Sequence, residues 1–263
     1  MKNFFLDIQY NEKKKYFLTG SVSTPRPVLQ EVEALSSVPA PRPDDQACTS
    51  LHLRNIFRKS GSRLTCINLS NLQLTGEINA GRTLKLQNLI TLNLSGSNIR
   101  EASFCELLGL TGQLKNLNIS FCTFSLDCLP PRRSKLSKIE SLTMKGCPAL
   151  NDKILPRILK ILPRVKYLDL SHCDADQGVL EKLISSCQSL QKLSLVNLEL
   201  NSNAMKSLSH HRLQTLHISA FRGLNLELIT NILSCMYSSK QVPQMSLLIA
   251  LGQHKFKELP ASL

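Results

Sequence analysis

Several features that mark common classes of protein are missing from this sequence of 263 residues. It contains no tryptophan, and aromatic residues make up only 5% of the chain, so it lacks the stacking platforms on which single-stranded nucleic acids bind. Its 11 glycines are scattered singly, and none forms a glycine-rich phosphate-binding motif. No apolar run approaches the roughly 18 residues that span a bilayer. We therefore expect neither a membrane span nor a nucleic-acid partner.

The sequence also lacks signs of secretion. The apolar run Phe4-Phe5-Leu6 ends at Asp7, which is too short for the core of a secretory signal. The nine cysteines include no Cys-x-x-Cys pair, and an odd number of them fits a reducing compartment. We expect an intracellular protein, cytoplasmic or nuclear or both, with a mitochondrial location as the alternative.

A short phrase recurs along the chain, with aliphatic residues at positions one, four and six of a predicted strand. Its seven copies, here called repeats one to seven, begin at Leu64, Leu89, Leu114, Ile139, Val165, Leu190 and Leu213. The starts are therefore 25, 25, 25, 26, 25 and 23 residues apart, and a fixed period of this size is typical of a solenoid. A weaker eighth copy reads Val242-x-x-Met245-x-Leu247.

The period predicts an α/β fold. Positions four and six point to one side of a strand, while positions three, five and seven point to the other. The connections are long enough for a helix that returns to a parallel neighbour, and Val179, Leu180, Leu183 and Ile184 have helical spacing. Because one repeat cannot bury its apolar side alone, we expect seven to eight repeats to stack as one unit, with a curved parallel sheet inside and helices outside.

Three regions are expected. Residues 1–45 are predicted to form a disordered N-terminal extension and proline-rich linker, because five prolines between Pro25 and Pro43 oppose regular helix. Residues 46–252 hold the repeats, and residues 253–263 form a C-terminal tail.

Three cysteines share one place in the repeat. Cys122, Cys147 and Cys173 fall at position nine, and we interpret them as small buried side chains that the repeat stacks without disulfide bonds. His172 beside Cys173 is the nearest approach to a ligand set, and it is too sparse for zinc. We expect no cofactor and no metal.

The cysteine-bearing segments carry a resemblance to a known family. Cys147-Pro-Ala-Leu150-Asn-Asp152-x-x-Leu155 and Cys187-x-x-Leu190-x-x-Leu193-x-Leu195 resemble the cysteine-containing leucine-rich repeats of F-box proteins and of their relatives without the F-box. The resemblance covers roughly residues 48–250. It implies a leucine-rich-repeat solenoid that recognises substrates or partners for SCF-type ubiquitin ligases, with a Skp-type adaptor and a cullin as partners.

The segment that would contact the ligase is not recognisable. In F-box proteins, an N-terminal helical segment of about 40 residues docks the Skp adaptor, and residues 1–45 have no such pattern. The alternative is a non-enzymatic assembly or scaffold factor that uses a basic face to hold acidic or membrane-associated partners, organellar ones included. The net charge of +13 permits this reading. Arg54, Arg58 and Lys59 would form one basic stripe on an outer helix, and a second would contain Lys153, Arg157, Lys160 and Arg164.

The solvent side of the sheet is predicted to bind a protein partner. Small polar residues dominate positions three, five and seven in repeats one to three, and larger or charged residues begin at repeat four. The predicted contact cluster contains Lys145, Tyr167, Asp169, Lys192, Val196 and His217. Asp169 is the only carboxylate in these rows of the seven repeats, and His217 lies two strands away, so acid–base catalysis lacks a second member. We expect a binding protein and not an enzyme.

Overall fold

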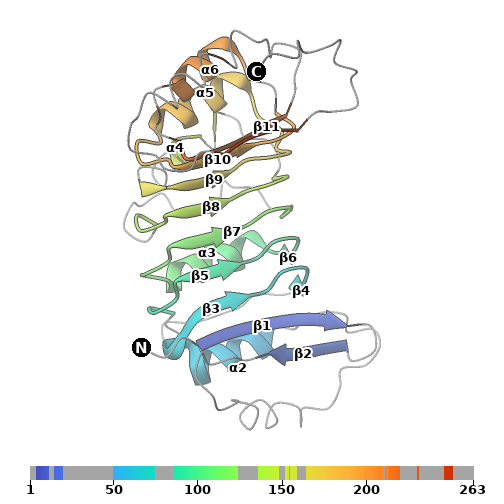
Figure 1. The fold of residues 1–263 in the computed structure, drawn as a ribbon. Coiled ribbons are helices and arrows are strands. Elements are labelled where there is room, and N and C mark those ends of the chain that lie inside the picture. Colours follow the sequence, from blue (N-terminus) through green and yellow to red (C-terminus); the bar gives the residue numbers. More distant parts are fainter. Residues whose placement is uncertain are drawn as a thin grey trace.

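A computed structural model of the chain describes residues 4–11, 15–19, 50–74, 86–123, 136–147, 152–153, 155–158, 164–198, 200–209, 211, 213–219, 230 and 246–250. Its main feature is a ten-stranded sheet with the order β12-β11-β10-β9-β8-β7-β5-β3-β1-β2 (Figure 1). All pairs are parallel except the hairpin of β1 (Phe4–Asn11) and β2 (Lys15–Thr19). The remaining strands are β3 (Leu64–Asn68), β5 (Thr91–Asn93), β7 (Asn116–Asn118), β8 (Ser141–Thr143), β9 (Tyr167–Asp169), β10 (Lys192–Leu195), β11 (Thr215–Ser219) and β12 (Ser246–Ala250).

The strand register follows the repeated phrase. Position three of each repeat is the Cα partner of position three in the next, from Cys66 to Thr215. Hydrogen bonds continue beyond the strands, since the position-eight N–H donates to the position-seven carbonyl of the following repeat, as Phe121 does to Lys145 at 2.7 Å. A second, two-stranded sheet pairs β4 (Gln73–Leu74) with β6 (Asn98–Ile99). The fold is therefore a solenoid-like α/β arrangement, as the sequence predicts.

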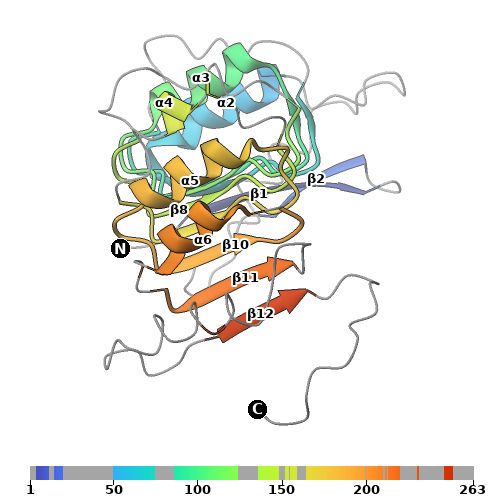
Figure 2. The same ribbon diagram turned by 90° about the horizontal axis from the view of Figure 1, so that it is seen from above.

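The helices cover one face of the sheet (Figure 2). They are α2 (Ser50–Ser60), the 3-10 turn η1 (Gly61–Arg63), α3 (Glu101–Leu110), α4 (Leu155–Ile158), α5 (Gln177–Ser186) and α6 (Ser202–Ser209). Positions one, four and six of all seven repeats are buried beneath them in one apolar core. Helix α5 buries Val179, Leu180, Leu183 and Ile184, the four residues whose spacing predicts it. None of the helices in the described part of the chain is long and apolar enough to cross a membrane.

Two expectations need correction. Strands β1 and β2 lie within residues 1–45, so the predicted disorder does not apply to them; β1 adds to the free edge of β3, where backbone groups find partners. The eighth strand pairs Leu216 with Leu247 and Ile218 with Ile249, which places it two residues beyond the predicted register. The predicted tail, 253–263, and most of the linker lie outside the described residues.

Candidate protein-binding surface

The side of the sheet without helices presents positions three, five and seven, and we call it the exposed sheet face (Figure 2). In β5, β7, β8 and β9 the central residue is buried and its two neighbours are half-buried. The face is therefore lined by polar side chains, short ones in β5, β7 and β8 and Tyr167 in β9, that stand on an apolar core.

Most position-five side chains of this face are engaged within their own repeat. Asn93 and Asn118 each accept a hydrogen bond through Oδ1 from the N–H at position seven, at 3.0 Å in both cases. Asn68 makes the same contact at 3.2 Å, and Asp169 makes it at 2.9 Å. These side chains terminate the strands, because they satisfy a backbone donor where the chain turns away.

In two repeats the position-seven N–H has a different acceptor. Position five is Thr143 in repeat four and Ser194 in repeat six, and the position-seven N–H groups there turn to the preceding repeat. Lys145 N donates to Ser120 Oγ at 3.2 Å, and Val196 N donates to Ser171 Oγ at 3.1 Å. The face is thus internally bonded across repeats, which makes it a preorganised surface.

The structure brings part of the predicted cluster together. Lys192 is the Cα partner of Tyr167 on the neighbouring strand, and it is exposed. The hydroxyl of Tyr167 donates to Asp169 Oδ2 at 3.4 Å, and burial, followed by the charge of Asp169, raises the pKa of Tyr167. His217 is separated from Asp169 by Ser194, so the two stand two strands apart, as the spacing predicts.

Two further predicted residues have neighbours outside the predicted cluster. Val196 is half-buried, and its carbonyl accepts a hydrogen bond from the N–H of His172 at 2.8 Å. The Nζ atom of Lys145 lies 5.9 Å from the ring centroid of Phe121 in the preceding repeat. Lys145 therefore forms a pair with Phe121, a residue that the predicted cluster does not contain.

Position eight has a backbone conformation that the repeated phrase did not predict. In repeats one to six its φ angle is positive, between 56° and 66°. The residues at this position are Asn71, Gly96, Phe121, Gly146, His172 and Asn197. Glycine and asparagine adopt this left-handed region readily, whereas phenylalanine rarely does. The recurrence of Asn and Gly at position eight was the signal in the sequence.

Phe121 is the unusual member of this column. Its side chain is 53% exposed, and its ring lies against the backbone of Gly146, where an added Cβ would lie 2.5 Å from Cδ1. Gly96 occupies the same position in the repeat before it. A large apolar ring therefore stands at the edge of the exposed sheet face between two positions without side chains.

The position-nine cysteines are buried, as the sequence predicts. Each thiol donates to the position-six carbonyl of the preceding repeat: Cys122 to Leu94 at 3.1 Å, Cys147 to Ile119 at 3.2 Å and Cys173 to Met144 at 2.9 Å. Burial raises the pKa of Cys122 and of Cys173 to about 11, and it raises that of Cys147 further. All cysteines in the described part of the chain are free.

The position-nine slot is not restricted to small side chains, however. Leu72 and Leu198 occupy it in repeats one and six, and both are buried. Position nine therefore requires a side chain that can be buried, and a cysteine there also donates a hydrogen bond to the preceding repeat.

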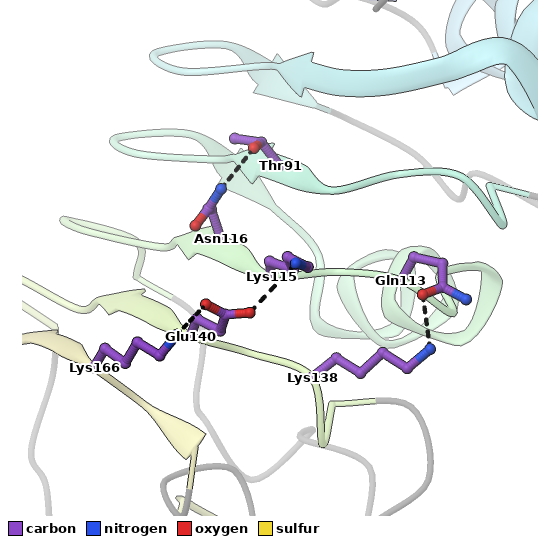
Figure 3. A network of polar contacts seen from close by, with 7 residues as sticks. All are labelled: Thr91, Gln113, Lys115, Asn116, Lys138, Glu140 and Lys166. Atoms are coloured by element: carbon purple, nitrogen blue, oxygen red, sulfur yellow. Dashed lines mark hydrogen bonds and ion pairs between the residues drawn. The ribbon is translucent and has the colours of Figure 1, made fainter. Parts of the chain in front are cut away.

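A charged ladder crosses three repeats at the other end of the strands, at position two (Figure 3). Glu140 lies 3.4 Å from the Nζ of Lys115 and 2.9 Å from that of Lys166. Hydrogen bonds from Lys166 and then Lys115 lower the pKa of Glu140. Beside it, Asn116 donates to Thr91 at 3.0 Å and Lys138 donates to Gln113 at 2.7 Å.

The structure describes one of the two predicted basic stripes in full and the other in part. Arg54, Arg58 and Lys59 are exposed on α2. Of the second stripe, Arg157 lies on α4, Lys153 lies in a turn before α4, Arg164 lies in a 3-10 turn after it, and Lys160 is outside the described residues. Within the described ranges, no three His, Cys, Asp or Glu residues are grouped to hold a metal ion.

The chain is similar to two known proteins over part of its length, and no family model matches it. It is 33% identical over 97 residues to Antagonist of mitotic exit network protein 1 of Candida glabrata, an alignment that covers 35% of this chain and 18% of that protein. It is 32% identical over 137 residues to a disease resistance protein of Arabidopsis thaliana, covering 50% of this chain and 13% of that protein. The chain thus spans less than a fifth of either relative. Together with the strand register, these similarities support a distant relationship to leucine-rich-repeat proteins.

Proposed function

We propose that the chain is a non-enzymatic protein-interaction module, built from seven leucine-rich repeats and a less regular eighth, that binds a protein partner on its exposed sheet face. The observation that carries this proposal is the hydrogen bonding of that face. Its position-seven N–H groups donate to position-five side chains of their own repeat or to the position-seven serine of the preceding repeat. A partner therefore meets a surface that needs little ordering on binding, and this lowers the entropic cost of association.

Tyr167 and Lys192 are the contact residues proposed on this face. Both side chains are at least partly exposed on adjacent strands, and tyrosine offers a large contact area with a polar end. The repeats beneath them bury positions four and six, so changes to these two side chains leave the core untouched.

The test compares two faces of one molecule. Tyr167→Ala and Lys192→Glu are each expected to weaken a captured partner by about 2 kcal/mol, or roughly thirtyfold, with little change in Tm. The matched control, Arg54→Glu with Arg58→Glu on α2, is expected to cost less than about 1 kcal/mol. Partners are captured by cross-linking to the wild-type chain, and their affinities for the purified variants are then measured.

The finer proposal places this module in the ubiquitin system. It is supported by the position-nine cysteines of three successive repeats, whose thiols each donate to the backbone of the preceding repeat. Recovery of a Skp-type adaptor and a cullin among the captured partners supports this role. Their absence from repeated captures that do yield other specific partners argues against it.

A second candidate function is a scaffold that holds acidic or membrane-associated partners, in an organelle or elsewhere. It is favoured by the exposed Arg54, Arg58 and Lys59 on α2, together with the net charge of +13. This role predicts the reverse ranking of the variants above, with the α2 reversals abolishing binding. It also predicts a steep loss of wild-type affinity with added salt.

A further inference from the structure

We propose that Phe121 is the anchor of the binding surface, and that with Lys145 it receives a segment in which an acidic side chain lies next to a large apolar one. This inference rests on the proposed function and deepens it, because it names the chemistry of the partner. It arises from the backbone conformation, the exposure and the charge around Phe121.

The backbone conformation indicates a role outside folding. Phe121 has a φ of 56° in a column where the other five residues are two glycines, two asparagines and a histidine. A phenylalanine in this region is strained by its own Cβ, and such strain persists where a side chain is needed for another purpose. Asparagine fills the same slot at positions 71 and 197, so the fold itself has no need of an aromatic ring there.

The exposure of the ring adds a second observation. Large apolar side chains that are exposed in the described part of the chain are Phe121, at 53%, and Ile90, at 37%. The Phe121 ring lies against Gly146, and Gly96 precedes it in the column. The absence of side chains at both glycines leaves the ring open to a partner, and aromatic residues are enriched where interfaces concentrate their binding energy.

The charge near the ring points to an acidic partner. Lys145 Nζ lies 5.9 Å from the ring centroid, and the described residues hold no salt bridge to Lys145 or to Lys192. The carboxylate of Asp169 is already engaged by Ser171 N and the Tyr167 hydroxyl. The surface from repeat three to repeat six therefore presents an aromatic ring and two lysines that a carboxylate can neutralise.

The experiment selects peptides against the full chain. A library of random 12-residue peptides displayed on yeast is sorted for binding to the wild-type protein, and the selected peptides are synthesised. We expect them to carry Asp or Glu next to an aromatic or large aliphatic residue. We expect Phe121→Asn and Lys145→Glu each to weaken them at least tenfold.

Two controls separate recognition from folding. His172→Asn introduces asparagine at position eight two repeats away, and we expect it to leave peptide affinity within about twofold of wild type. Because asparagine is at ease in the left-handed region, Phe121→Asn is expected to keep or raise the Tm while it weakens binding. A lower Tm for Phe121→Asn would show that the ring serves the fold, and it would overturn the proposal.

The remaining outcomes distinguish the anchor from the binding module. If Phe121→Asn binds the peptides as wild type does while Tyr167→Ala weakens them, the anchor is wrong and the proposed function stands. Selected peptides without acidic residues would overturn the charge argument in the same way. If no peptide depends on either residue, or none is selected, both proposals fail.

Discussion

Asp169 accepts a hydrogen bond from the backbone N–H of Ser171 at 2.9 Å. Asn93 makes the same contact to Ser95, and Asn118 makes it to Ser120, each at 3.0 Å. Asp169 therefore acts first as a strand terminator, and its charge is an addition that the asparagines do not have. A carboxylate in a predicted binding cluster can thus be present for reasons of backbone hydrogen bonding.

This dual role makes a prediction about two substitutions. Asp169→Asn keeps an acceptor for Ser171 N and should leave the free energy of unfolding within about 0.5 kcal/mol of wild type. Asp169→Ala removes the acceptor and should cost about 1 kcal/mol. Urea unfolding measures both, and Asn118→Ala is the matched control that should behave like Asp169→Ala. Equal stability of Asp169→Ala and wild type would mean that the contact contributes nothing.

The buried thiols predict resistance to alkylation. Burial raises the pKa of Cys122 and Cys173 from 9.0 to about 11, so at a given pH below 9 the thiolate fraction falls about a hundredfold. Iodoacetamide followed by peptide mass spectrometry should label the half-buried Cys66 and Cys105 before the buried Cys122, Cys147 and Cys173. Cys122, Cys147 and Cys173 should be labelled only in denaturant, and their rapid labelling in the native protein would contradict the packing described above.

The same pKa shifts set a pH dependence of stability. A thiol whose pKa is higher in the folded state favours folding fully below its unfolded pKa, and this contribution is lost as the pH rises through the folded value. Unfolding free energy should therefore decline between about pH 9 and pH 11. The variant Cys122→Ser with Cys173→Ser, compared by urea unfolding at pH 8 and pH 10.5, should decline less than wild type over this interval.

The sequence predicted the repeat and its core, but not every register or side-chain direction. Positions four and six of seven strands lie where the phrase places them, because the burial of Leu117 or Leu168 leaves one compatible register. The eighth strand was misplaced by two residues because Met245, Leu247 and Ile249 alternate with the same period. A shift of two residues preserves which side each residue faces.

The candidate site was harder to predict than the core. Strand alternation places Tyr167 and Lys192 on neighbouring strands, and the structure does so. Strand alternation cannot predict that Lys145 turns toward Phe121, because that contact depends on side-chain torsions and on the positive φ of position eight. Strands β1 and β2 were missed because they carry no copy of the phrase; they pair with each other in a hairpin, and β1 joins the sheet at the edge of β3.

The charged ladder at position two predicts an ordered pair of pKa changes. Glu140 lies closer to Lys166 than to Lys115, at 2.9 Å against 3.4 Å, and the hydrogen bond from Lys166 is the largest single cause of its lowered pKa. Lys166→Met should therefore raise the pKa of Glu140 more than Lys115→Met does, as measured by NMR titration of the side-chain carboxyl carbon.

The sign of the accompanying stability change follows from the lowered pKa. Ionised Glu140 favours the folded state above its unfolded pKa, and this contribution is lost as the pH falls through the folded value. Because the pair is exposed to solvent, salt should weaken the pKa difference between the two lysine variants. An unchanged difference in 1 M NaCl would point to a cause other than these ion pairs.

Gly146 provides the sharpest test of the position-eight column. Its φ is +63°, and a Cβ there would lie 2.5 Å from Cδ1 of Phe121. Gly146→Ala should therefore cost about 1–2 kcal/mol through the backbone alone, and more through displacement of the ring.

In the double variant Gly146→Ala with Phe121→Asn, the ring is gone and only the backbone cost should remain, so the two effects should be non-additive by at least about 0.5 kcal/mol. Gly109→Ala is the matched control, because Gly109 lies in helix α3 and an added Cβ would meet nothing within 4 Å beyond its own stretch of helix, and it should stabilise the chain by up to about 1 kcal/mol. Strict additivity of Gly146→Ala and Phe121→Asn in urea unfolding would show that the ring does not rest on Gly146 in solution.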